Sequence, residues 1–208
     1  PPAAGIDLEP NHDNERLINC LIRNCTAEGN SGSGFHVYLR PLARHSNNVS
    51  ITFDSCLIKA NQRYGLSMAG LEDDSPAGLI EFRNCTVEHA QRAGAYIQDK
   101  AIGELKVRFV NCKFYNTAEN DSAPVRIHLG NDKRVSRLGG IELDDCYIYD
   151  DKDRPAVLVS GNGGHEGISD LLGTVFVSNP HGARLDLGKN PQETGVRLVD
   201  LRDIAGND

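Results

Sequence analysis

A glycine or proline followed by alternating apolar and polar residues returns about every 30 residues along the whole chain. The leading positions are Gly5, Gly34, Gly65, Gly94, Pro124, Pro155 and Gly182, which lie 27 to 31 residues apart. Each precedes a short segment such as Phe35-His36-Val37-Tyr38, with the two-residue period of a β-strand. A steady period in this range indicates a solenoid, in which each repeat packs only on its neighbours.

Each repeat also carries two further segments with strand periodicity. A polar pair separates them, as Asp54-Ser55 separates Ile51-Thr52-Phe53 from Cys56-Leu57-Ile58. Asn, Asp and Ser favour such corners because they tolerate unusual backbone angles and bond their own main chain. The 3.6-residue period of helices is absent. The sequence therefore predicts an all-β, single-stranded right-handed parallel β-helix, with about seven coils and three short strands per coil, as one domain over residues 1–208.

The cysteines follow the same repeat. We assign five cysteines to the repeat because a small polar residue precedes each: Cys20, Cys56, Cys85, Cys112 and Cys146. The sequence contains no Cys-x-x-Cys pair, so a zinc site is not predicted. We expect reduced cysteines stacked in the core, because a free cysteine packs as a small apolar residue. Cys25 is expected to lie off this file as a more exposed thiol.

The Gly/Pro-led strands and the repeated Asn-Cys corners, such as Asn84-Cys85 and Asn111-Cys112, resemble the pectin lyase-like superfamily over the whole chain. The resemblance implies a sheet that floors a groove for an extended polysaccharide, and a secreted, periplasmic or cell-surface protein. The motif set of polygalacturonases is absent as an ordered group, so we carry over no catalytic residue. A leucine-rich repeat is the nearest alternative, but its period is shorter and it has one strand per repeat.

Strand alternation predicts two files of outward side chains on the sheet of Gly/Pro-led strands. The first file is Asp7, His36, Ser67, Tyr96, Arg126, Val157 and Arg184. The second is Glu9, Tyr38, Ala69, Gln98, His128, Val159 and Asp186. Ala156 and Leu158 are correspondingly expected in the core files. Adjacent rungs lie about 4.8 Å apart, so Asp7 is expected beside His36, and Glu9 beside Tyr38.

These files are interpreted as a saccharide-binding groove, because tyrosines offer flat faces and the charged side chains offer hydrogen bonds. Hydrolysis commonly uses two carboxylates, and Asp7 with Glu9, assisted by His36 and Tyr38, is the predicted catalytic set. Elimination needs a base and a cation beside the substrate carboxylate, which His36, Tyr38 and Arg40 could supply. The residues predicted to hold the sugar chain are Arg40, Tyr96, Gln98, Lys100, Arg126 and His128.

Two functions without catalysis stay open. One is a carbohydrate-binding module with the same files but no essential carboxylate. The other is a structural spike or adhesin segment, for example a trimer, in which subunits bury the files and the outward Val157 and Val159. No cofactor is predicted, and calcium bound by the acid-rich segments Asp144-Asp145 and Asp150–Asp153 is a minor alternative.

The net charge and the open strand edges indicate which binding partners the chain is expected to have. The formal net charge of −7 gives no support for a nucleic-acid surface, and no apolar run approaches the length of a membrane span. An open β-helix end exposes unpaired strand edges. We therefore expect either upstream coils or a partner subunit at the end that begins near Gly5. With upstream coils, residues 1–208 would be the C-terminal part of a longer β-helix.

Overall fold

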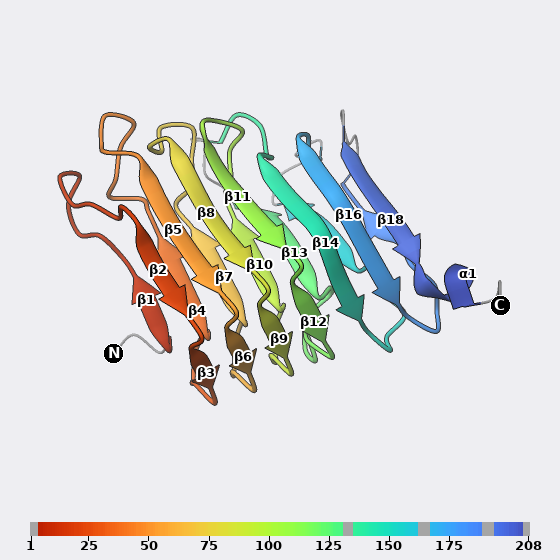
Figure 1. Ribbon diagram of the computed structural model, residues 1–208. Helices are drawn as coiled ribbons and strands as arrows, with labels where there is room; N and C mark the ends of the chain where they lie inside the picture. The colour runs from red at the N-terminus through yellow and green to blue at the C-terminus, as the bar shows by residue number, and fades with distance from the viewer. Residues whose placement is uncertain (1–3, 131–134, 162–166, 189–193, 206–208) are drawn as a thin grey trace.

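The computed structural model describes residues 4–130, 135–161, 167–188 and 194–205, and its strands wind into a parallel β-helix (Figure 1). Seven strands that follow the repeated Gly or Pro form one sheet, here called sheet A. In order across the sheet they are β1 (Ile6–Leu8), β4 (Phe35–Tyr38), β7 (Leu66–Ala69), β10 (Ala95–Gln98), β13 (Val125–Leu129), β15 (Val157–Gly161) and β17 (Leu185–Asp186). Every neighbouring pair is parallel and joins residues about one repeat apart, as Phe35 pairs with Leu66. The predicted all-β parallel helix is confirmed.

The other two walls of the helix form sheet B. The strands of one wall are β2 (Cys20–Arg23), β5 (Val49–Asp54), β8 (Gly78–Arg83) and β11 (Leu105–Val110). Those of the other wall are β3 (Thr26–Glu28), β6 (Leu57–Lys59), β9 (Thr86–Glu88) and β12 (Lys113–Tyr115). Three strands per coil are thus present in the first four coils. The long strand β14 (Ile141–Tyr149) pairs with both β11 and β12 and joins the two walls.

The later coils are completed by β16 (Leu171–Ser178) and β18 (Gly195–Asp200), which is followed by the short helix α1 (Leu201–Ala205). At the other end, β1 is an edge strand of sheet A, and Ile6, Leu8 and Ile22 pack against the core while only partly buried. The expected partner for this end stays a prediction.

The corners between the two walls of sheet B have the same backbone conformation in each of five coils. The corner residue has a φ between 49° and 55° at Asn24, Ser55, Asn84, Asn111 and Asp145. A left-handed backbone is costly for most residues, and short polar side chains such as Asn and Asp tolerate it best. This requirement explains the repeated polar residue before each cysteine of the stack.

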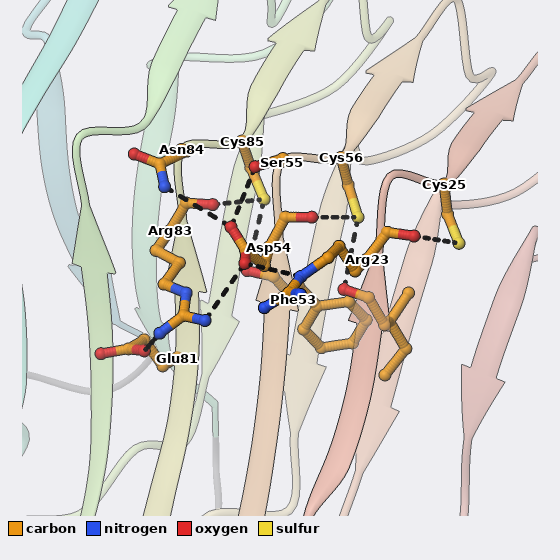
Figure 2. Close-up of polar contacts among 11 residues, drawn as sticks. Arg23, Cys25, Phe53, Asp54, Ser55, Cys56, Glu81, Arg83, Asn84 and Cys85 are labelled. Atoms are coloured by element: carbon orange, nitrogen blue, oxygen red, sulfur yellow. Dashed lines mark hydrogen bonds and ion pairs between the residues drawn. The ribbon is translucent and has the colours of Figure 1, made fainter.

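The cysteine file differs in one member from the prediction. All six cysteines are free, as expected, but the stacked file consists of Cys25, Cys56, Cys85, Cys112 and Cys146. Cys20 instead begins β2 and pairs with Ile51. Both Cys20 and Cys25 follow an asparagine with left-handed φ, so the local sequence alone did not separate them. The thiols lie near carbonyls one coil earlier, as Cys85 Sγ lies 3.5 Å from Phe53 O (Figure 2).

Asp54 ties three coils together on the outside of this corner (Figure 2). It accepts hydrogen bonds from Arg23 Nε at 3.0 Å, from Arg83 Nη2 at 3.1 Å and from the Ser55 hydroxyl at 2.9 Å. The bonds from Arg83 and Ser55 lower the pKa of Asp54 from 3.8 to about 2. A lowered carboxyl pKa stabilises the fold fully above pH 3.8, and that contribution is lost as the pH falls through about 2.

The strand after Pro155 is shifted by one residue from the predicted register. Val157, not Ala156, pairs with Val125, because the turn before β15 holds one residue more than the repeat predicts. Val157 and Val159 are therefore buried, and the prediction that they face outward is wrong. The first outward file continues instead with Leu158, which pairs with Asp186 rather than with Arg184.

Three phenylalanines, Phe53, Phe82 and Phe109, stack on successive coils in the core, and Phe35 of sheet A packs on the first of them. Successive ring centroids are 5.0 Å apart from Phe35 to Phe53, 4.6 Å from Phe53 to Phe82 and 5.0 Å from Phe82 to Phe109. All four rings are buried. Because neighbouring coils align equal positions on sheet B, the Phe82 ring packs between those of Phe53 and Phe109, and this stack depends on every coil keeping its register.

Phe82→Ala removes a ring from the middle of this stack. We expect the free energy of unfolding, measured by urea denaturation, to fall by about 3–5 kcal/mol, because the cavity lies between two fixed rings. Phe82→Leu keeps most of the volume and should lose less than half as much. Equal, small losses for the two variants would contradict a tightly packed phenylalanine stack.

Candidate functional site

A hollow of about 570 Å³, here called the sheet A groove, lies over the outward face of the first coils. Its floor is formed by Ser67 and Ala69 of β7. In register with them, β4 carries His36 and Tyr38, and β10 carries Tyr96 beside Ser67. The groove therefore lies where one strand carries small outward side chains and the strands on both sides of it carry large ones. Its other lining residues are Ala4, Asp7, Glu9, Gly32, Ser33, Arg63, Tyr64 and Gln98.

Three of the four predicted catalytic residues meet at this groove. Asp7 and His36 are paired in register, as expected, and both line it together with Glu9. Tyr38 does not line it: its ring lies 6.4 Å from the His36 ring and 5.8 Å from Arg40 Cζ. The structure thus brings together two carboxylates and an imidazole, and leaves Tyr38 beside them.

Asp7 has one unsatisfied oxygen. Its Oδ1 atom is buried and has no hydrogen-bond partner among the described residues. A buried carboxylate oxygen without a donor is unfavourable, because it has lost water without gaining a bond.

Tyr64 is a groove residue that the sequence analysis missed. Its ring stacks on that of Tyr96, with centroids 4.3 Å apart and planes at 8°. Its carbonyl accepts from Gly34 N at 3.0 Å, as the carbonyl of Ser33 accepts from Gly5 N at 3.1 Å one coil earlier. The face of Tyr64 away from Tyr96 is thus directed toward a coil that carries only a serine at this position. The available signal was its place directly before the repeated glycine.

Two predicted sugar-binding residues lie beside the groove rather than in it. Arg126 Cζ lies 5.7 Å from the Tyr96 ring centroid, and the His128 ring lies 6.0 Å from it. Arg126 donates to Asp121 Oδ1 at 3.0 Å, and His128 Nδ1 lies 3.1 Å from Ser160 Oγ. Burial, followed by the charge of Arg126, lowers the pKa of His128. The charge on Arg126 is thus already shared with a protein carboxylate.

Tyr96 and Gln98 do line the groove, and Arg40 does not. Burial and the nearby Tyr64 raise the pKa of Tyr96 to about 12, so its hydroxyl stays protonated at neutral pH. Gln98 Nε2 donates to Asp99 Oδ2 at 2.9 Å, which fixes the amide. Arg40 is held by the buried Glu72, with Nη2 to Oε1 at 2.8 Å.

Lys100 does not reach the sugar-binding face. Its side chain is buried, with 1% of the residue exposed, and Nζ donates to the carbonyl of Ala101. Asp99 has a left-handed φ of 53°, which breaks strand alternation after Gln98 and turns the next side chain inward. The predicted placement of Lys100 is therefore wrong. Burial, together with the charge of Lys106, lowers the pKa of Lys100 from 10.5 to about 7.

Burial of Lys100 predicts a pH-dependent stability. Burying the charged lysine destabilises the folded state. This destabilisation is fully present below pH 7 and disappears toward pH 10.5, because between these values Lys100 is neutral in the folded state and takes up a proton on unfolding. The contribution of Lys100 to the free energy of unfolding should rise by up to about 1.4 kcal/mol per pH unit in this window. Lys100→Met should remove the rise and raise stability at pH 6. Lys113→Met, on the outer surface, should keep it; an unchanged profile in Lys100→Met would contradict the placement.

In the acid-rich segments that suggested calcium, Asp144, Asp150 and Asp153 form ion pairs with arginines. Asp144 lies 3.2 Å from Arg108, and the buried Asp150 lies 2.7 Å from Arg154. Across the described residues, no group of three or more His, Cys, Asp or Glu side chains is arranged to hold a metal ion. The described helix is also too short to cross a membrane.

Comparisons with protein families, with curated proteins and with solved structures found no match. The structure itself shows a parallel β-helix with a groove on sheet A. Chemically, the groove combines an aromatic face, fixed hydrogen-bonding groups and two carboxylates. This combination suits a flat, polyhydroxylated ligand better than an apolar one.

Proposed function

We propose that the sheet A groove binds an extended saccharide, as the resemblance to the pectin lyase-like superfamily implies. The observation that carries this proposal is the groove over the small residues Ser67 and Ala69, which Tyr64 and Asp7 also line. The sheet provides a rigid floor, because its strands are fixed by parallel hydrogen bonds to both neighbours.

Stacking supports the proposal. The C–H face of a sugar ring packs on a flat aromatic ring, and Tyr64 is held flat by Tyr96 behind it. A pre-oriented ring loses little conformational freedom on binding. Gln98 is likewise fixed by Asp99, so its remaining amide groups are directed before the ligand arrives.

Cleavage of the bound chain is a second candidate, favoured by the two carboxylates of Asp7 and Glu9 that line the groove with His36. In a hydrolase, Asp7 and Glu9 would act as acid and base on the glycosidic bond. Elimination has less support, because Arg40 is bound to Glu72 and Lys100 is buried. The same groove without turnover would make the protein a carbohydrate-binding module.

A panel of soluble polysaccharides tests both proposals, with binding read by affinity electrophoresis and cleavage by new reducing ends. Tyr64→Ala should weaken binding about tenfold or more, the factor that ~1.4 kcal/mol of lost contact produces. Tyr115→Ala, which breaks a similar ring stack with Tyr149 on sheet B, is the matched control. If the protein hydrolyses its ligand, Asp7→Asn should abolish products and retain binding.

Three outcomes would decide against these proposals. No binding to any member of the panel, or unchanged binding by Tyr64→Ala, would overturn the saccharide groove. Binding without products in the wild type would overturn cleavage alone. A stable trimer that buries sheet A would favour the structural alternative instead.

A further inference from the structure

Two arginines at one lip of the sheet A groove differ from most of the others in the described chain. The arginines that pair with carboxylates are Arg23, Arg40, Arg83, Arg108, Arg126, Arg154, Arg184 and Arg202. Arg63 and Arg92 are exposed and form no ion pair with any described residue. The described arginines Arg16, Arg44, Arg137 and Arg197 form no such ion pair either, but Arg63 and Arg92 lie beside each other on successive coils.

The backbone places the two arginines side by side. Arg92 N donates to Arg63 O at 2.8 Å, and Arg63 N donates to Gly32 O at 3.0 Å. The two residues therefore occupy the same position on successive coils, about 4.8 Å apart. The matching position one coil earlier is Gly32, and Ala118 N bonds to Arg92 O one coil later. The pair is thus flanked by small residues that leave room around it.

Arg92 contacts the ring on which the saccharide would stack, and Arg63 lines the groove beside it. Arg92 Cζ lies 5.7 Å from the Tyr64 ring centroid, and Nη1 lies 3.4 Å from the Tyr64 hydroxyl. The nearby Asp121 acts on Arg92 only from a distance, because its carboxylate forms its ion pair with Arg126 at 3.0 Å.

We infer that Arg63 and Arg92 form a subsite for a sulfate ester on the saccharide. The inference rests on the proposed function. A sulfate group presents three oxygens in different directions, so it can accept bonds from two guanidinium groups on adjacent coils, whereas a carboxylate suits one arginine bidentately. Asp7 and Glu9 lie elsewhere in the same groove and would repel a densely charged chain. The ligand expected is therefore a saccharide with sulfate along one edge and free hydroxyls on the other.

The test compares matched polymers: neutral dextran and cellulose ethers with their sulfated, phosphorylated and carboxymethylated derivatives. Affinity electrophoresis should show the sulfated form binding the wild-type protein about tenfold or more tightly than the neutral form. In the double variant Arg63→Gln/Arg92→Gln, the ratio of the affinities for the sulfated and the neutral polymer should fall to about one. Arg197→Gln removes an exposed positive charge far along the chain and should keep the preference.

A second readout does not depend on the sugar. Replacing chloride by inorganic sulfate at constant ionic strength should raise the melting temperature of the wild type more than that of the double variant. The comparison between variants removes the general stabilising effect of sulfate on proteins.

The failures are distinguishable. If neutral and sulfated polymers bind equally, or the double variant keeps the preference, the sulfate subsite is overturned while the saccharide groove stands. Equal binding of carboxymethylated and sulfated polymers, or tighter binding of phosphorylated ones, would overturn the choice of sulfate. If no polymer binds at all, the proposed function itself fails.

Discussion

The structure depends on parallel hydrogen-bonded pairing of each coil with the next in one register. Such pairing sets coils about 4.8 Å apart and places equal positions directly above one another. A side chain is then surrounded mainly by its own counterparts. The stacked rings of Phe53, Phe82 and Phe109, and the file of buried cysteines, are consequences of that single constraint. Outside the core, Asp54 uses the same alignment to bond arginines on the coils before and after it.

The groove arises where this regularity is broken. A file of equal outward side chains would make a flat or ridged surface. Small residues at Ser67 and Ala69 lower one rung, and Tyr64 rises from the preceding turn against Tyr96. On the lip, Arg63 and Arg92 repeat one position while the coils around them carry small residues. The chemistry of the site thus lies in departures from the repeat, on a floor that the repeat makes rigid.

The period alone was enough to predict the fold class and the register of the sheet A strands from β1 to β13. The predicted side-chain directions were wrong wherever a single residue interrupted the strand alternation. An extra residue before β15 turned Val157 inward, and the left-handed Asp99 buried Lys100. Since strand faces alternate every residue, a slip of one exchanges the core and solvent faces. Cys20 and Cys25 show a related limit, because the local signal before both was the same asparagine.

The candidate site was predicted in part. Asp7, Glu9, His36, Tyr96 and Gln98 lie on strands or at their ends, where alternation specifies the face, and all five line the groove. Tyr64, Arg63 and Arg92 lie in turns, for which the alternation rule says nothing. Their contribution became visible only when the coils were stacked and the turns of neighbouring coils were seen to align.

The most direct measurement is an amide chemical-shift titration of isotope-labelled protein with a polysaccharide fragment that it binds. The account predicts that the shifts concentrate at Ser33, His36, Tyr64, Ser67 and Gln98. The outer wall at Tyr115 and Tyr149 should stay unchanged. Shifts centred on sheet B, with the amides around Ser67 unmoved, would contradict the assignment of the groove on sheet A as the binding site.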